Sequence, residues 1–443
     1  MNRIAAPTQS STWNTSSTSI LKYFDIRSIN SADGVLSSRS ILPTVLVLYP
    51  IAAARSCVGD NGGTTDEDIR NGFKRTVELL TESLKTGSEV EDLLVYPIVY
   101  NARHSIELSL KIVIKMLWRI EEKKGICYSE EVLKERKKEL HTHSIECLYK
   151  LACDKKNIDR RIPAYFENIE DMIYFYYFDE EGDAFKYELN KEDEPHMIKN
   201  KISHVSIELL ETEFKEVMKK FDDLIYFLDN CIFEYSLGTF TKSLSRADIW
   251  DISKRLPVYE EWRTEKFKEV KDEIKQEYHL GSKEFSDAVN LIKENREFSV
   301  NIGCEKVFGS ITENELKEYA SLVKYYSEKS KSDNKGKEIG FDLRKIQKNG
   351  EILKKYLSSI SMNTLNTLLC FSEMSNSFLA VEHLEEVHDD IVSKAFDGTY
   401  LIRKLKQRNI CLRILYGMKK CGQVTYAKQL SAALEQEGVE LTL

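Results

Sequence analysis

The sequence predicts a mainly α-helical protein that contains several helical domains. Three observations support this fold class. The 443 residues include only 7 prolines and 19 glycines, which are few for a fold of short strands and tight turns. Apolar residues recur at helical spacing over most of the chain. A serine or threonine stands three residues before an acidic residue at Ser88–Glu91, Ser245–Asp248 and Thr312–Glu315, a pattern typical of helix N-termini.

The clearest predicted helix runs from Tyr100 to Trp118. One stripe is apolar, with spacings of four, three and four residues, and consists of Ile106, Leu110, Val113 and Leu117. A second stripe recurs every four residues and is charged; it consists of Arg103, Glu107, Lys111 and Lys115. Pro97 lies just upstream, where we expect the helix to start. We therefore expect a core helix whose charged stripe faces water and forms i,i+4 ion pairs.

The other elements follow in chain order. Helices are expected at about 66–85, 129–139, 141–152, 204–230, 245–256, 262–279 and 282–301, and from 312 onwards. Two aromatic-rich runs flank residues 179–183, where Gly182 can adopt a positive φ, so 171–189 is predicted to form a β-hairpin. The apolar stretch 45–50 is expected to be a buried strand or turn. The predicted domains are 1–90 (partly irregular), 91–238, 239–329 and 330–443.

Charge and cysteine usage exclude several classes of protein. With 64 basic and 72 acidic residues the net charge is −8, so the whole chain does not attract nucleic acid or anionic membrane. The nine cysteines are scattered and none has the spacing of a zinc site, which fits a reducing cytoplasm. The apolar run 41–54 is too short to span a bilayer and is interrupted by Pro43 and Pro50. We expect a cytoplasmic protein without a membrane segment, metal or other cofactor.

One segment near the C-terminus is locally basic. Between Gly398 and Leu434 there are eight basic residues and no acidic one. Two interpretations remain open: the segment packs against the acidic helix before it, or it binds phosphate groups of a nucleic acid. The candidate nucleic-acid-binding residues are Arg403, Lys404, Lys406, Arg408 and Arg413.

Three short motifs between residues 91 and 230 resemble a known family. In chain order they are Arg103-His104-x-x-Glu107-x-x-x-Lys111 on a helix, Thr142-His143 followed by the leucine-containing stretch 144–151, and the acidic, glycine-containing aromatic stretch FYYFDEEGDAF at 175–185. This order resembles the HEPN superfamily, small helical bundles of prokaryotic toxin and defence systems. The resemblance implies a helical bundle that carries a small β-hairpin.

Many HEPN proteins are metal-independent ribonucleases whose motif has four to six residues between an arginine and a histidine. The matching residues here are Arg136 with His141 and His143. In such chemistry a histidine moves a proton and an arginine holds the scissile phosphate. A structural alternative places His143 inside the bundle and His141 on the surface. Arg103 and His104 form a second candidate set, with a simple salt-bridge ladder as the alternative.

Two functional hypotheses follow. The first is a defence or toxin-type protein that binds or cleaves RNA, with RNA or a nucleotide as ligand and metal-independent endoribonuclease activity as one form. The second is a non-enzymatic helical scaffold or sensor. Under either hypothesis we expect a homo-oligomer, such as a homodimer, and a second defence-system protein as a partner.

Overall fold

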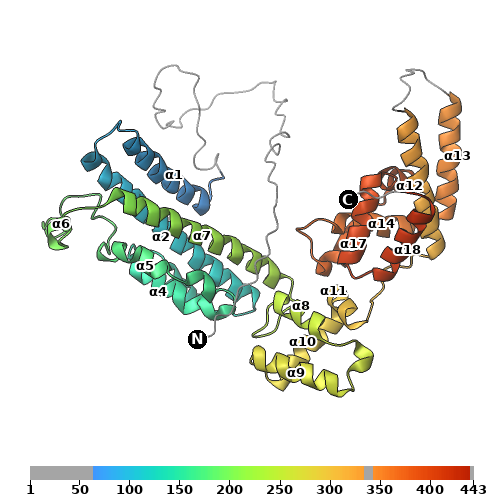
Figure 1. The fold of residues 1–443 in the computed structure, drawn as a ribbon, viewed down its shortest axis with the longest axis horizontal. Coiled ribbons are helices and arrows are strands. Elements are labelled where there is room, and N and C mark those ends of the chain that lie inside the picture. Colours follow the sequence, from blue (N-terminus) through green and yellow to red (C-terminus); the bar gives the residue numbers. More distant parts are fainter. Residues whose placement is uncertain (1–62, 334–342, 440–443) are drawn as a thin grey trace, which may run out of the picture. The chain divides into compact units, whose positions relative to one another are not determined.

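The computed structural model describes residues 63–333 and 343–439 (Figure 1). Within these ranges the chain is helical apart from connecting segments, and its only β-pairing is an isolated antiparallel bridge between Leu189 and Pro195. The mainly helical fold class is therefore confirmed. The buried strand or turn expected at 45–50, like the rest of residues 1–62, lies outside the described residues. None of the described helices is both long enough and apolar enough to cross a membrane.

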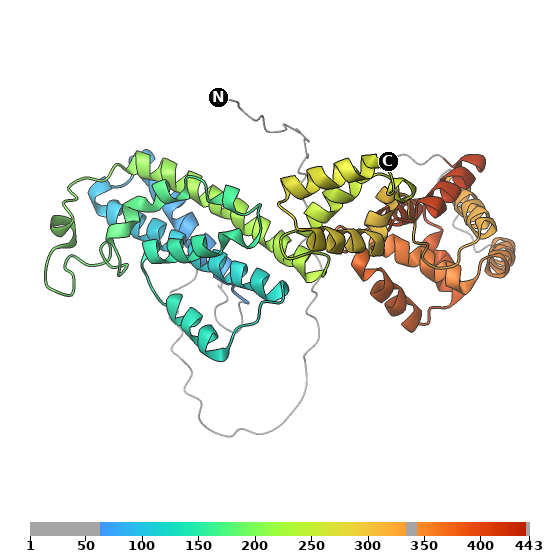
Figure 2. The same cartoon turned by 90° about the horizontal axis from the view of Figure 1, so that it is seen from below.

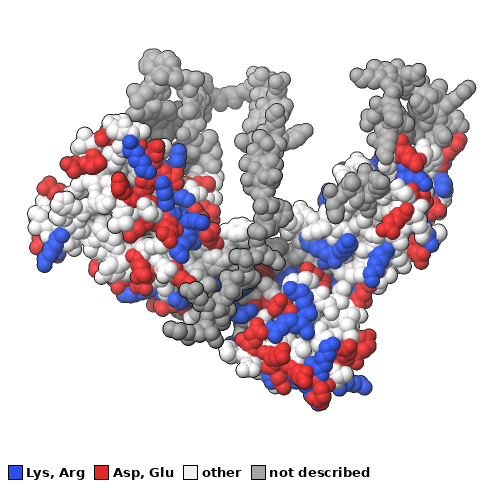
Figure 3. Space-filling model, in the orientation of Figure 1, with Lys and Arg blue, Asp and Glu red and all other residues white. Residues whose placement is uncertain are grey.

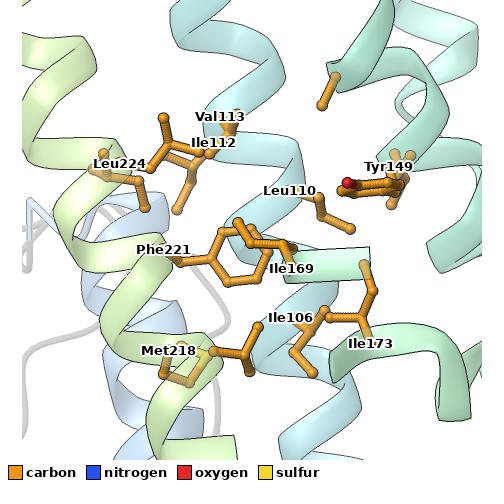
Figure 4. Packing of buried hydrophobic residues seen from close by; sticks show 14 of the residues in the cluster. Ile106, Leu110, Ile112, Val113, Tyr149, Ile169, Ile173, Met218, Phe221 and Leu224 are labelled. Atoms are coloured by element: carbon orange, nitrogen blue, oxygen red, sulfur yellow. The ribbon is translucent and has the colours of Figure 1, made fainter. Parts of the chain in front are cut away.

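The first hydrophobic core is built around one long helix, α2. Its main elements are α1 (Asp66–Lys85), α2 (Glu91–Lys123), α4 (Ile145–Lys155), α5 (Ile169–Ile173) and α7 (Ile207–Ser236). Helices α1 and α7 lie beside α2 in both views of the fold (Figure 2). The predicted apolar stripe of α2 is confirmed, because Ile106, Leu110, Val113 and Leu117 are all fully buried. Figure 4 shows Ile106 and Leu110 among side chains of α4, α5 and α7.

The start of α2 differs from the prediction. The helix begins at Glu91 after Val90, so Pro97 lies inside the helix rather than at its start. The predicted capping role of Ser88 is wrong, since its hydroxyl donates to the carbonyl of Ser83 at the end of α1. Proline has no N–H for the helical hydrogen bond, so α2 lacks the bond that residue 97 would otherwise donate to the carbonyl of Leu93.

The predicted β-hairpin at 171–189 is wrong. The segment consists of α5, a 3-10 helix at Tyr174–Phe178, and a turn followed by irregular chain. Ile169, Ile173 and Tyr176 are buried at spacings of four and three residues, which is helical rather than alternating. The chain bends at residues 180–182, where Gly182 adopts the predicted positive φ, at +74°.

The second and third hydrophobic cores are also helical. One contains α8 (Arg246–Arg255), α9 (Glu265–Glu277), α10 (Ser282–Glu294) and the short α11 (Arg296–Ser299). The predicted cap at Ser245–Asp248 is confirmed. The single helix predicted for 282–301 is interrupted at Asn295, whose side chain accepts hydrogen bonds from the backbone of Glu297 and Phe298 and so starts a new helix.

The last core contains the C-terminal helices. They are α12 (Glu313–Asp333), α13 (Leu343–Ser359), α14 (Met362–Met374), α15 (Leu384–Ser393), α16 (Gly398–Leu405), α17 (Arg408–Lys420) and α18 (Val424–Gln436). The predicted cap at Thr312–Glu315 is confirmed. Helices α14 and α17 touch at Gly417, where an added Cβ would lie 1.8 Å from the carbonyl oxygen of Phe371. Only glycine permits this close contact.

Candidate functional site

Arg103 on α2 is a buried connection between three segments of the first core. Its Nη1 donates to Oε2 of Glu107 at 3.0 Å. Its Nη2 donates to the backbone carbonyls of His143, at 2.6 Å, and Asp179, at 2.8 Å. Its Nε lies 2.8 Å from Oδ2 of Asp179. The expectation that Arg103 faces water is wrong, because the side chain is only 2% exposed.

The turn after the 3-10 helix at Tyr174–Phe178 covers the guanidinium of Arg103. An added Cβ at Gly182 would lie 2.8 Å from Nη1 of Arg103. The turn is closed from within, since Oδ1 of Asp179 accepts from the backbone N–H groups of Asp183 and Ala184. Arg103 therefore acts as a positioning residue, and this packing leaves no room for a phosphate group on its Gly182 side.

Glu107 is the acceptor at which the candidate residues meet. Its Oε1 accepts from Nζ of Lys111 at 2.8 Å and lies 3.0 Å from Nδ1 of His143. Like Arg103 it is 2% exposed, so the predicted water-facing position is wrong for Glu107 too. Burial by itself raises the pKa of Glu107, but the neighbouring His104, Lys111 and Arg103 outweigh burial. They hold its pKa well below the usual glutamate range, and the carboxylate stays ionised.

His143 combines a buried partner with an exposed ring. It precedes α4, whose N-cap is Ser144. Its side chain is 55% exposed while Nδ1 points to the buried carboxylate of Glu107. The alternative that His143 is packed inside the bundle is therefore wrong. An ionised carboxylate at Nδ1 favours the tautomer with a proton on Nδ1, which leaves Nε2 able to accept a proton.

His104 lies beside the same carboxylate but is held by aromatic rings. Its ring stacks on Tyr100 with 5.9 Å between centroids and meets the edge of Phe73 at 4.4 Å. Its Nδ1 is 3.9 Å from Oε2 of Glu107, which is too long for a hydrogen bond. Packing against rings thus fixes His104, whose side chain is 25% exposed.

Arg136 does not share this site. It lies on α3 (Glu130–Glu139), and its Nη2 donates to Oε2 of Glu121 at 2.7 Å. Its guanidinium also lies 3.7 Å from the ring centroid of Tyr128 and 5.1 Å from that of Trp118. The structure pairs Arg136 with Glu121 and His143 with Glu107, while His141 is exposed just after α3.

The basic C-terminal candidates lie on α16 and α17. Arg403 and Lys404 are exposed, the Lys406 ammonium lies 4.2 Å from the ring centroid of Tyr326, and Arg408 begins α17. Arg413 is exposed and its Nε donates to Oγ of Ser375 at 2.9 Å.

The acidic helix before this segment takes its partners elsewhere. Glu382 pairs with Arg246 and Glu385 with Arg296, both on earlier helices. One interpretation of the sequence expected the basic segment to pack against this acidic helix. Glu382 and Glu385 do not pair with that segment.

The positions of two residues in the candidate site were not anticipated. Glu107 was expected to be a surface ion-pair partner, and Asp179 was expected in a hairpin turn. The charged spacing of α2 shows the Arg103–Glu107 pair, but no sequence signal shows that His143 and Asp179 join it. Among the described residues, no group of three or more histidine, cysteine, aspartate or glutamate side chains is suited to hold a metal ion.

Comparisons with protein-family models, curated proteins and solved structures found no match for this chain. The chemistry must therefore be inferred from the residues themselves. A half-exposed histidine whose second nitrogen is held by an ionised carboxylate is an arrangement suited to proton transfer.

Proposed function

We propose that this protein acts on RNA without a metal ion, with His143 as the general base and Glu107 as the residue that orients it. The observation that carries the proposal is the 3.0 Å contact between Nδ1 of the half-exposed His143 and the buried carboxylate of Glu107. The resemblance of residues 91–230 to the HEPN superfamily supports RNA as the substrate. It also supports a prokaryotic defence or toxin system in the cytoplasm as the setting, with a second protein of that system as a partner.

The proposed reaction is an internal transfer of the phosphodiester. Nε2 of His143 takes the proton of a ribose 2′-hydroxyl, and the 2′-oxygen attacks the adjacent phosphorus. The bond to the 5′-oxygen breaks, that oxygen gains a proton from water, and a 2′,3′-cyclic phosphate forms. Lys111 contacts the same oxygen of Glu107 and keeps 18% of its side chain exposed, which suits it to approach a phosphate.

The test is RNA cleavage by the purified full chain in EDTA. His143→Ala should lower the cleavage rate by about 10²- to 10⁴-fold, the usual contribution of a general base. His141→Ala is the matched control, because His141 is an exposed histidine two residues away that lies outside the Glu107 contact. Circular dichroism checks that both variants are folded. Cleavage by His143→Ala at the wild-type rate would reject the proposal.

A second candidate function is a non-enzymatic scaffold that forms a homodimer. It is favoured by a groove of about 730 Å³ between the first turns of α2 and the chain before α7, lined by Val95, Tyr96, Phe185 and Met197 among others. Beside it, Leu93 on α2 is 70% exposed, and Val90, which precedes α2, is 58% exposed. Exposed apolar side chains grouped at a groove are typical of docking surfaces.

The scaffold hypothesis is tested by light scattering of the wild type and of Leu93→Glu. A dimer that dissociates in Leu93→Glu, together with no RNA cleavage, would favour it over the ribonuclease. Leu133→Glu is a suitable control, since Leu133 is 46% exposed on α3. A wild-type monomer would reject homodimerisation.

A further inference from the structure

Two exposed aromatic side chains lie on segments that are joined by basic residues of α17. Tyr416 lies on α17 itself, and Phe378 lies on the segment 375–380, which connects α14 to the next turn of helix. Phe378 is 81% exposed and Tyr416 is 60% exposed. Arg413, Tyr416 and Lys420 follow one another at spacings of three and four residues, so they share one face of α17. We call Phe378, Arg413, Tyr416, Lys419 and Lys420 the aromatic–basic face.

The segment that carries Phe378 is fastened to this face of α17 at two points. Nε of Arg413 donates to Oγ of Ser375, and Nζ of Lys420 donates to the carbonyl of Asn376 at 2.6 Å and to that of Leu379. The segment is also bonded internally, because Phe378 N–H donates to Oδ1 of Asn376 at 3.0 Å. Tyr416 lies between the two points of attachment along α17.

Exposure of Phe378 is therefore a property of an ordered segment rather than of a loose one. Burying a phenylalanine side chain stabilises a fold by about 1.5–3 kcal/mol, a gain that this chain forgoes at position 378. Helix α17, to which this segment is attached, packs closely against α14, because Gly417 allows α17 to contact the backbone of α14 at Phe371. An aromatic ring held outward on a segment attached to basic residues of α17 is positioned to stack on a ligand.

The charges around the rings indicate an anionic ligand. Arg413 and Lys419 are exposed, and no acidic residue occurs between Gly398 and Leu434. Glu373 approaches this face, with its Oε2 3.7 Å from Nη2 of Arg413. Glu297 also interacts electrostatically with Lys420. The centre of a protein interface is normally apolar and poor in lysine, whereas Phe378 is flanked by Ser377, Asn376 and the basic residues of α17.

We propose that the aromatic–basic face binds single-stranded nucleic acid. Phe378 and Tyr416 stack on bases, Arg413 and Lys419 contact phosphates, and Lys420 positions the segment 375–380. Aromatic rings combined with a basic surface are the usual means of binding a single strand without sequence preference. RNA as the particular strand rests on the proposed function, but the binding face stands independently of His143.

The experiment measures binding of a fluorescent 12-nucleotide oligouridine to the full chain by anisotropy. His143→Ala serves as the parent protein so that cleavage does not interfere. Phe378→Ala and Tyr416→Ala should each weaken binding by about 5- to 100-fold, the usual loss for one stacked base. Tyr174→Ala is the matched control and should bind like the parent, because Tyr174 is 69% exposed in the first core. Phe378→Trp should retain the parent affinity.

The charges are tested by salt dependence. Removing Arg413 or Lys419 should reduce the slope of log K against log salt by about 0.7, the value for one phosphate contact on a single strand. Binding of deoxythymidine oligomers together with oligouridine supports a face that reads bases and phosphates rather than the 2′-hydroxyl.

The proposal is overturned if Phe378→Ala and Tyr416→Ala bind oligouridine as tightly as the parent, if duplex RNA binds as tightly as the single strand, or if the full chain binds neither. Cleavage by His143→Ala at the wild-type rate, with the effects of Phe378→Ala and Tyr416→Ala on binding retained, would reject only the role of His143. The two proposals therefore fail separately.

Discussion

Glu107 and Glu121 on α2 provide an informative comparison. Both are buried carboxylates with an arginine and a lysine as partners. Glu107 pairs with Arg103 and Lys111, whereas Glu121 pairs with Arg136 and, at 3.1 Å, with Lys155. The side chains of the two glutamates are 2% and 6% exposed.

The difference lies in the third kind of partner. Glu107 also contacts His143, a titratable group that reaches solvent, while the arginine on Glu121 is covered by the rings of Tyr128 and Trp118. A buried ion pair is thus no guide to function by itself, since such networks are often structural. What distinguishes the surroundings of Glu107 is an exposed histidine joined to a carboxylate that stays ionised. Four changes would sharpen or break this comparison.

Arg103→Met should have the largest effect. It removes the shared partner of two buried carboxylates, Glu107 and Asp179, and such losses cost about 3–5 kcal/mol. Urea denaturation followed by circular dichroism measures the change in the free energy of unfolding. Arg119→Met is the control, because Arg119 is exposed on the same helix and should change stability by less than about 0.5 kcal/mol. If Arg103→Met lowers the free energy of unfolding by less than about 1 kcal/mol, the connection that Arg103 makes between the three segments is not needed for stability.

Arg136→Met should destabilise by less, about 2–3 kcal/mol, because Lys155 still neutralises Glu121 after the change. The same urea experiment measures it, with the exposed Lys134→Met on the same helix as control. Folded Arg136→Met protein should cleave RNA like the wild type. Loss of cleavage with an intact fold would return Arg136 to the catalytic set and remove the contrast between the two glutamates.

Gly182→Ala should cost about 1–3 kcal/mol. Part of this cost is the φ of +74°, and part is the contact with Nη1 of Arg103. Gly238→Ala separates the two contributions, because Gly238 also has a φ of +74° but no atom near its added Cβ. Thermal unfolding of both variants gives the difference due to Arg103. Equal losses of stability in the two variants would mean that the added Cβ at position 182 makes no unfavourable contact with the guanidinium of Arg103.

The pH dependence of stability should show the smallest effect. The folded pKa of Glu107 is lowered, so its contribution is complete above the unfolded pKa of about 4.3 and is lost as pH falls towards the folded pKa. Between pH 7 and pH 4 the wild type should lose about 0.6 kcal/mol through this one carboxyl. Glu107→Gln should lack that part of the loss. Urea midpoints at the two pH values measure this loss of stability. Equal losses between pH 7 and pH 4 in the wild type and in Glu107→Gln would contradict the assignment of the lowered pKa to Glu107.

Local spacing was sufficient for the elements and for the pairs within them. The apolar stripe of α2, the Arg103–Glu107 and Glu107–Lys111 pairs, and the caps at Ser245–Asp248 and Thr312–Glu315 all follow from residues three or four positions apart. Helix geometry alone brings such residues together. The charged stripe of α2 was predicted to face water because the residues within one helical turn do not show which distant residues pack against it.

Only the tertiary structure decided that this stripe becomes part of a buried cluster and a candidate site. His143 and Asp179 reach Arg103 and Glu107 from 36 to 76 positions away, and the turn at Gly182 closes over them. The aromatic run at 174–178 was misjudged because its burial depends on packing against α4 and α5, which the run by itself does not show. Periodicity records which face of an element is apolar, whereas burial of a charge depends on partners that the fold brings from distant parts of the chain.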